Sequence, residues 1–324
     1  MQNVLTSACV GLPAQGWHEE SKVMLNIKEI AIIIASTGRP AELGRWINHI
    51  ERQTIKPTEM IWVVSSNLDL PPDAANLPSS HVKIIQAPKS LTAQRNAGLD
   101  ALHHDVEIVA FFDDDYVPSR SCLADIVASF TALPDVVGLT GRLLADGINT
   151  PGISYKNAER MIQIFESQDS SRTRQSRAFK PTKGLYGCNM AFRRESIGDC
   201  RFDERLPLYA WQEDWDFASR VSNGRKIGWT DGFVGVHQGV KNGRTSGTRF
   251  GYSQIANPIY LYRKGSMDAQ KASMLMLRNL IANHVRAFRS EAWIDRRGRV
   301  TGNWLALRDF FRSSLDPKRV LEID

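Results

Sequence analysis

The chain has 324 residues, of which 42% are hydrophobic and 23% charged, the proportions of an ordinary soluble protein. That length allows one large domain or two smaller ones with a sizeable core. The net charge of +6 is modest, and the four cysteines lack the spacing of a zinc site or a disulfide framework. No apolar run approaches the roughly 18–20 residues that span a bilayer.

The amino-terminal segment and the cysteines bear on the compartment. Residues 1–28 are mixed and polar, so we expect a loose extension or a strap across the domain rather than a signal peptide. Because no disulfide framework is indicated, a reducing, cytosolic compartment is the default.

Strands and helices alternate from about residue 29. Ile30–Ala35 is a continuous apolar run typical of a strand buried on both faces of a parallel sheet, and Pro40 fits the first turn of a helix. Further strands are expected at 60–64, 82–86, 106–112 and 136–144, and helices at 40–53, 90–102 and from Ser119 or Ser121 to 133. This β-α-β-α-β order predicts an α/β fold with a doubly wound, mostly parallel sheet.

The pattern weakens beyond residue 144. Residues 145–183 lose it, and the polar segment 167–177 predicts a mobile surface loop. Strands at 185–193 and 233–236 and a helix at 213–221 are expected next. Residues 238–253 are rich in Gly, Ser, Thr and Arg, which fits a lid that orders on ligand binding. We therefore expect an extension (1–28), a sheet domain (29–237), and a lid with a helical carboxy-terminal region (238–324).

Three consecutive carboxylates, Asp113, Asp114 and Asp115, follow the strand expected at 106–112. Clustered like charges repel, and hard oxygen ligands are those that magnesium or manganese prefers. At the carboxyl end of a strand in an open α/β sheet, they would face the crevice where ligands bind. The alternative is a solvated acidic turn in which Asp115 or Ser119 caps the next helix. Both interpretations stay open on these residues alone.

A second acidic cluster surrounds Asp214. Glu213, Asp214 and Asp216 lie between Trp211 and Phe217, just before an expected helix. Partly apolar walls raise the pKa of a carboxylate and make it a better general base. The alternative is a first helical turn in which the acids complement the helix dipole and the aromatic side chains pack.

A third candidate is the helix expected at 90–102. Arg95 and Asn96 lie on its first turns, where they could reach a ligand's phosphates or the neighbouring aspartates. The planar fork of arginine matches diphosphate oxygens. The alternative is an ordinary surface arginine.

Four elements occur together in a recognisable order. They are the Ile-Ile-Ile-Ala-Ser-Thr-Gly-Arg-Pro strand and turn, the Gln-Arg-Asn-Ala-Gly-Leu helix, the Phe-Phe-Asp-Asp-Asp strand end and the Glu-Asp pair. In these elements the chain, from Ile30 to about His237, resembles a family-2 glycosyltransferase of the type found in bacterial polysaccharide synthesis. The resemblance implies an inverting enzyme with the A-type nucleotide-sugar-binding fold.

The resemblance also implies roles on the donor side. The nucleotide would lie against Ser36, Thr37 and Arg39, and Arg95 would contact the donor. Members of the family commonly place an aspartate after the second strand, where it reads the base. This chain has Val63-Val64-Ser65-Ser66-Asn67 there, so Ser65 or Asn67 would take over that contact.

A divalent cation, Mn²⁺ or Mg²⁺, is the implied cofactor. Asp115 would ligate it directly, Asp113 would hold the ribose or the metal's water shell, and Asp114 would touch the sugar. His237 stands near the place where related enzymes have a metal-binding histidine. The alternative for His237 is a strand-end histidine with satisfied hydrogen bonds.

On the acceptor side, the resemblance implies that Asp214 is the general base. Glu213 would orient the acceptor or support the base, and Trp211 would lie at the rim. The segment that contains Asn189 resembles the family's acceptor-side strand, so Asn189 is a candidate acceptor contact. A plain buried strand is the alternative for that segment.

The implied reaction moves a sugar from a UDP- or GDP-type donor to a hydroxyl of a saccharide or lipid-linked acceptor. A sugar-phosphate nucleotidyltransferase is the enzymatic alternative, and the single glycine in Ser36-Thr37-Gly38-Arg39-Pro40 argues against it. A non-catalytic protein that binds polyanions through the arginine-rich tail from Arg286 onward is the alternative from another class. No nucleic-acid partner is expected.

Apolar residues recur at helical spacing in the carboxy-terminal region. They are Met274, Leu277, Ile281 and Phe288, followed by Trp304, Leu307 and Phe311. Core packing or dimerisation is the default for such stripes. The second hypothesis is peripheral contact of a basic amphipathic surface with the inner face of the cell membrane.

Overall fold

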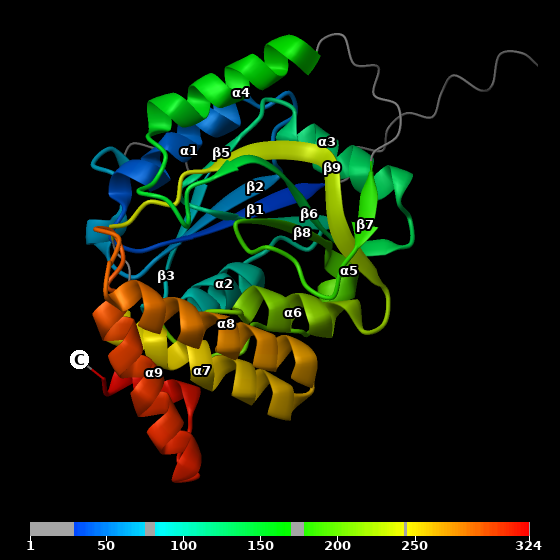
Figure 1. Ribbon diagram of the computed structural model, residues 1–324. Helices are drawn as coiled ribbons and strands as arrows, with labels where there is room; N and C mark the ends of the chain where they lie inside the picture. The colour runs from blue at the N-terminus through cyan, green and yellow to red at the C-terminus, as the bar shows by residue number, and fades with distance from the viewer. Residues whose placement is uncertain (1–28, 75–81, 170–177, 243–244, 324) are drawn as a thin grey trace, which may run out of the picture.

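The computed structural model describes residues 29–74, 82–169, 178–242 and 245–323. The extension expected at 1–28 and residues 170–177 of the expected polar loop lie outside these ranges. A mixed sheet forms the centre, in the order β3-β2-β1-β4-β8-β6-β9-β5, with β7 paired to β9 (Figure 1). Its strands are β1 (Ile30–Ser36), β2 (Glu59–Val64), β3 (Val82–Gln86), β4 (Ile108–Asp113), β5 (Tyr116–Pro118), β6 (Val136–Asp146), β7 (Phe179–Pro181), β8 (Asn189–Arg193) and β9 (Lys226–His237).

The first half of the sheet is parallel, and the predicted doubly wound α/β arrangement is confirmed. β1 pairs in parallel with both β2 and β4, and β2 pairs in parallel with β3. β8 then pairs antiparallel with β4 and with β6. The carboxyl ends of β1, β2 and β4 consequently meet at one edge, which is the ligand-binding edge of such sheets.

Helices cover both faces of the sheet (Figure 1). The helices are α1 (Pro40–Arg52), α2 (Leu91–Asp100), α3 (Cys122–Ala132), α4 (Tyr155–Asp169), α5 (Arg194–Ile197), α6 (Glu213–Ser222), α7 (Gly247–Lys264), α8 (Ala269–Ala287) and α9 (Arg296–Phe311). Because side chains alternate along a strand, Ile32 packs in the core under α1 and α3, while Ile33 packs in the core under α2 and α6. This double burial explains why β1 is apolar throughout.

The helices α7 and α8 lie against α2 and α6, and α9 packs against α7 and α8 (Figure 1), so the predicted helical carboxy-terminal region is present. Leu91 and Trp215 pack against Leu261 and Leu275. The Asn257 side chain donates to the Trp211 carbonyl at 2.8 Å. The carboxy-terminal helices therefore hold the loop that leads into α6. In the part of the chain described, no helix combines the length and apolarity that crossing a membrane requires.

Several expected element boundaries are wrong. Residues 155–169 form α4, where an irregular stretch was expected, because Ala158 and Ile162 give the helix a buried side. β8 begins at Asn189 rather than at residue 185, and β9 begins at Lys226. The expected lid is partly helical, since Ser246 caps α7 by accepting from the Arg249 backbone N–H.

Candidate active site

The three aspartates at the end of β4 differ in exposure. Asp113 keeps a side-chain exposure of 34%, whereas Asp114 and Asp115 are buried. The helix that follows begins at Cys122, with Ser121 rather than Asp115 or Ser119 at the N-cap position. The alternative of a solvated turn with Asp115 or Ser119 as the helix cap is therefore wrong.

Asp114 links β4 to the turn after β1. Its Oδ2 accepts a hydrogen bond from the Ser36 hydroxyl at 2.7 Å, and its Oδ1 lies 2.7 Å from Arg39 Nη1. Burial raises the pKa of Asp114, and the Arg39 charge opposes that rise. Both carboxylate oxygens are thus occupied by side chains of the β1 turn, which places Arg39 over the aspartates.

Asp113, Asp115 and His237 converge on one point, with ligand atoms within 4.8 Å of one another. His237 Nε2 lies 3.4 Å from Asp115 Oδ1 and 3.8 Å from Asp113 Oδ2. Among the described residues, the buried Oδ1 of Asp115 has no hydrogen-bond partner, while its Oδ2 accepts from Val240 N–H at 2.7 Å. An unsatisfied carboxylate oxygen beside a second carboxylate and an imidazole nitrogen matches the ligand set of a divalent cation.

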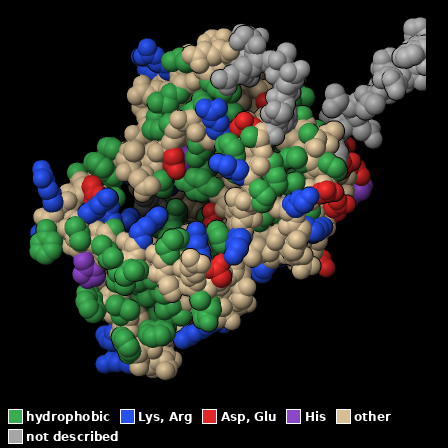
Figure 2. All heavy atoms as spheres, turned by 45° about the vertical axis from the view of Figure 1, so that its right-hand side comes forward, with side chains coloured by type: hydrophobic (Ala, Val, Ile, Leu, Met, Phe, Trp, Pro, Cys, Tyr) green, Lys and Arg blue, Asp and Glu red, His purple; other side chains and the backbone are tan. Residues whose placement is uncertain are grey.

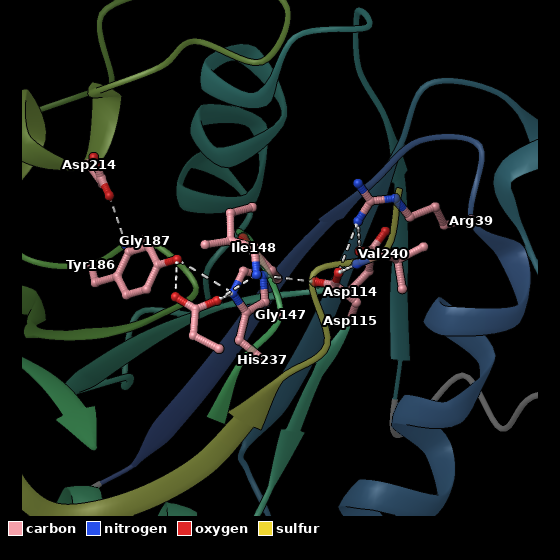
Figure 3. A network of polar contacts seen from close by, with 12 residues as sticks. Arg39, Asp114, Asp115, Gly147, Ile148, Tyr186, Gly187, Asp214, His237 and Val240 are labelled. Carbon is pink, nitrogen blue, oxygen red and sulfur yellow. Dashed lines mark hydrogen bonds and ion pairs between the residues drawn. The ribbon is translucent and has the colours of Figure 1, made fainter. Parts of the chain in front are cut away.

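His237 is held from its other side by residues that the sequence gave no reason to select. Its Nδ1 lies 2.9 Å from Asp146 Oδ1, and the Tyr186 hydroxyl donates to Asp146 Oδ2 at 3.0 Å (Figure 3). Burial lowers the pKa of His237, but Asp115 and Asp146 outweigh it and raise this pKa to about 10. The contact with Asp146 orients the His237 ring, so that Nε2 faces Asp113 and Asp115.

Arg95 joins the aspartates of β4 to the acidic cluster of α6. Its Nη1 lies 2.6 Å from Glu213 Oε1, and its Nη2 lies 3.1 Å from Asp113 Oδ1. The side chain is buried, and Nη2 also donates to the Gly187 carbonyl at 2.9 Å. Arg95 is therefore no surface arginine. Asn96, by contrast, hydrogen-bonds the Phe202 backbone away from the aspartates.

Asp214 is a partly buried carboxylate whose hydrogen bonds within the described chain come from backbone N–H groups. Its Oδ2 accepts from Gly187 N–H at 2.9 Å (Figure 3), and its Oδ1 accepts from Trp215 N–H at 2.8 Å. Burial raises the pKa of Asp214, and these N–H groups oppose the rise. For Asp216 the alternative interpretation holds, because this residue lies in the first turn of α6 and pairs with Arg220 and Lys264.

The loop before α6 has an unusual backbone. Leu208, Ala210 and Gln212 have φ angles of 57°, 50° and 74°, in the left-handed region that ordinary residues rarely adopt. Such strain persists only where surrounding contacts enforce it and clusters at functional sites. Here it directs Trp211 and Glu213 toward the cavity described next.

Two cavities meet at Asp113. The larger, of about 630 Å³, is lined by Asp113, Glu213, Asp214 and Trp211 among others. The smaller, of about 220 Å³, is lined by Thr37, Arg39, Asp113 and Asp114 among others. Asp113 therefore lines the same cavity as Glu213 and Asp214, and it shares the smaller cavity with Asp114.

The turn after β2 contains a carboxylate that the sequence interpretation overlooked. Asp69 accepts hydrogen bonds from Gly38 N–H at 2.6 Å and from the Ser65 hydroxyl at 2.6 Å. The hydroxyl oxygens of Thr37 and Ser65 lie 3.4 Å apart. Ser66-x-x-Asp69 is a capping box, and this pattern is the sequence signal that could have identified Asp69. Asp69 thus ties the β2 turn to the β1 turn.

Asn189 is the candidate that the structure does not bring to the site. It is fully buried, accepts from the Thr140 hydroxyl at 2.6 Å and lines neither cavity. It shares the sheet face of Ala191, which packs in the core under α1 and α3. The expectation that Asn189 contacts an acceptor is therefore corrected, because the parity of β8 turns it away.

Solved structures of low sequence identity share this architecture. TarS residues 1–349 from S. aureus is 16% identical with a TM-score of 0.54, over 90% of this chain and 82% of that one. The mannosyltransferase PcManGT from Pyrobaculum calidifontis, solved with GDP-Man and Mn²⁺, is 16% identical with a TM-score of 0.51, over 90% and 85%. GalNAc-T7, solved with UDP, GalNAc and Mn²⁺, is 12% identical with a TM-score of 0.54, over 92% and 56%.

These likenesses establish the fold, which is the A-type glycosyltransferase fold. No curated protein matches the sequence significantly. The family model described as glycosyl transferase family 2 matches residues 31–201, just over half of the chain. The resemblance seen in the four sequence elements is thereby confirmed, and this protein belongs to glycosyl transferase family 2.

Proposed function

We propose that this protein is an inverting glycosyltransferase that moves a sugar from a UDP- or GDP-type donor to a hydroxyl of a saccharide or lipid-linked acceptor. Membership of the family supports glycosyl transfer in general. The observation that carries the finer proposal is the position of Asp113, which lines both cavities and so joins a cation-type site to the cavity that holds Asp214.

The smaller cavity is the proposed donor site. Thr37 and Arg39 line it, and Ser36 and Ser65 support its wall through Asp114 and Asp69. Arg39 provides a guanidinium fork for diphosphate oxygens. Its side chain is also fixed by donation to the Asn242 carbonyl at 2.9 Å, which ties the β1 turn to the segment before α7.

Asp113, Asp115 and His237 would hold Mn²⁺ or Mg²⁺ in this site. A bound divalent cation would act as a Lewis acid toward the departing diphosphate. Structures of PcManGT and GalNAc-T7 were solved with Mn²⁺, which supports a divalent cation of this kind. Asp146 and Tyr186 would then position His237 rather than contact the substrate.

On the acceptor side, Asp214 would take the proton from the attacking hydroxyl. Its burial raises its pKa and so improves it as a general base. Gly187 and Trp215 fix both of its oxygens, so the base is oriented before the acceptor binds. A base in the larger cavity and a leaving diphosphate in the smaller one suit a single displacement, which inverts the anomeric centre.

A donor screen tests the proposed function. We expect manganese-dependent release of nucleoside diphosphate from at least one of UDP-glucose, UDP-galactose, UDP-N-acetylglucosamine and GDP-mannose, and we expect excess EDTA to stop it. If none is hydrolysed, and none raises the melting temperature together with manganese, the proposal is refuted.

Replacing Asp146 with asparagine tests the positioning of His237. We expect manganese affinity to fall about 10–100-fold, because a partner that orients a metal-bound histidine contributes by that order. Titration calorimetry with Mn²⁺ measures it, and the exposed Asp135→Asn serves as the control. Unchanged affinity in D146N would show that Asp146 has no role in the cation site.

We also propose that the protein works in the cytoplasm, in polysaccharide synthesis at the inner face of the cell membrane. The described cysteines Cys122, Cys188 and Cys200 carry free thiols, as in a reducing compartment. The apolar stripe of α8 is not core: Met274, Leu277, Ile281, Val285 and Phe288 are 51–94% exposed. Arg278 and Arg289 flank it, and their charge complements anionic lipid.

Vesicle flotation tests the membrane contact. We expect the protein to float with phosphatidylglycerol vesicles at low salt and not with phosphatidylcholine vesicles. The double variant Leu277→Glu, Ile281→Glu should stay in the soluble fraction. Flotation that is absent for the unmodified protein would refute the contact.

A further inference from the structure

The far wall of the larger cavity is strongly basic. Among the described residues, four arginines from α8, α9 and the segment between them line it: Arg278, Arg286, Arg296 and Arg299. Figure 2 shows Lys and Arg side chains around the hollow on this side of the molecule. The opposite wall holds Asp113, Glu213 and Asp214, with Arg95 between them. The cavity thus has an acidic end and a basic end.

The acids near the basic wall neutralise only part of it. Glu291 accepts from Arg286 at 3.0 Å and from Arg296 at 2.8 Å, so two guanidinium groups share one carboxylate. Asp295 caps α9 by accepting from Gly298 N–H at 2.8 Å. Counting both acids, the wall keeps an excess of positive charge, and it lines a space rather than open surface.

Arg299 and Arg278 have different surroundings from Arg286 and Arg296. Arg299 lies over Phe250, with its guanidinium carbon 4.5 Å from the ring centre. Arg278 has no hydrogen bond or ion pair with any residue in the described ranges, although it lines the cavity. A guanidinium in a cavity without a carboxylate partner is suited to bind an anion from outside the protein.

Aromatic side chains lie between the two ends. Tyr209, Trp211 and Phe250 line the same cavity, and the Tyr209 and Trp211 rings meet the Phe250 ring edge-on at 5.6 and 6.0 Å. Such rings offer apolar faces with polar tips to a ligand. A molecule that fills the cavity would contact Asp214, the aromatic faces and the arginines.

Resting on the proposed function, we infer that the acceptor is a phosphate-bearing saccharide or polyol. Its attacking hydroxyl lies at Asp214 and its phosphate lies at Arg278 and Arg299. The donor's own phosphates belong to the other cavity, on the Arg39 side of Asp113. A dianionic phosphate fits several guanidinium forks better than a neutral sugar or a single carboxylate would.

Binding of a simple sugar phosphate tests this inference without donor or turnover. Calorimetry on the full chain, in EDTA, compares glucose 1-phosphate with glucose. We expect the phosphate to bind at least tenfold more tightly, and Arg278→Gln to remove on the order of tenfold in affinity. Arg297→Gln, which changes an exposed arginine of α9 outside the cavity wall, is the matched control and should bind as the unmodified chain does.

Equal binding of glucose and glucose 1-phosphate would overturn the inference, and so would equal affinities in R278Q and R297Q. Because Arg278 is exposed and unpaired within the described ranges, its replacement should leave the melting temperature unchanged, which confirms folding. Arg299→Gln provides a second variant on the same wall.

Transfer assays then separate two sources of the phosphate. One acceptor is a water-soluble oligomer with phosphodiester bridges, and the other is a lipid diphosphate sugar in detergent. Transfer to either supports the inference, and transfer only to a neutral saccharide overturns it. A chain that prefers glucose 1-phosphate yet hydrolyses no nucleotide-sugar would refute the proposed function alone, whereas donor hydrolysis without phosphate preference would refute this inference alone.

Discussion

Replacing Asp214 with asparagine should lower turnover by ~10²–10⁴-fold, the usual contribution of a positioned general base. Donor and manganese binding should persist, because Asp214 lines the larger cavity only, whereas the donor-side arginine and aspartates line the smaller one. Steady-state kinetics measures turnover, and thermal stabilisation by manganese with the nucleoside diphosphate reports donor-side binding.

The pH dependence of the rate provides a second test of the role of Asp214. Burial raises the pKa of Asp214, and a base must be deprotonated, so the rate of the unmodified enzyme should fall as pH drops through that raised pKa. The residual activity of D214N should lack this acid limb. Turnover within a few-fold of the unmodified enzyme would remove Asp214 from the base role, whatever its stability.

Replacing Arg95 with methionine should destabilise the fold by about 3–5 kcal/mol, the usual cost of removing one partner from a buried ion pair. Arg95 is the shared partner of Glu213 at 2.6 Å and Asp113 at 3.1 Å. Burial opposes the charge on Arg95, but Glu213, Asp113 and Asp214 outweigh it and raise its pKa. Without the guanidinium, these carboxylates would lack their common counter-charge.

Urea unfolding provides the measurement for Arg95. The matched control is Arg201→Met, because Arg201 pairs with Asp100 at 2.8 Å in an exposed surface bridge. Such a bridge contributes about 0–1 kcal/mol. A loss in R95M no larger than the loss in R201M would show that Arg95 does not hold the two acidic clusters together.

The features that the sequence could predict depend on local pattern. The unbroken apolar run of β1 and the position of Asp113 at the end of the apolar β4 need only strand periodicity and the end of a strand. Parallel strands then bring their carboxyl ends to one edge. For that reason Arg39 and Asp114, far apart in the chain, could be expected together, and they lie 2.7 Å apart.

The features that escaped prediction depend on long-range geometry. Asp146 reaches His237 only because β6 and β9 pair in parallel through several irregularities in register, which no local pattern encodes. Asn189 was misplaced because one residue of strand parity decides which face of the sheet a side chain occupies. Leu208 and Ala210 have left-handed backbone angles, but neither is a glycine, the residue that usually marks such angles. The strained loop before α6 could therefore not be predicted from the sequence.

The arginine wall shows a further limit. In the sequence, Arg299 belongs to the basic tail from Arg286 onward, whose most common meaning is solvated surface, and Arg278 lies beside an apolar stripe whose default is core packing or dimerisation. Only the packing of α7 and α8 against α2 and α6, and of α9 against α7 and α8, turns them toward the cavity that contains Asp214. Their assignment to a ligand therefore required the tertiary structure.

Anomalous diffraction from crystals grown with Mn²⁺ and either UDP or GDP would locate the cation and the diphosphate together. We expect a manganese peak between Asp113, Asp115 and His237, with the diphosphate on the Arg39 side and an open path to Asp214. Manganese found only at the exposed cluster of His103, His104 and Asp105, with these three site residues unliganded, would contradict the proposed arrangement of cation and base around one cleft.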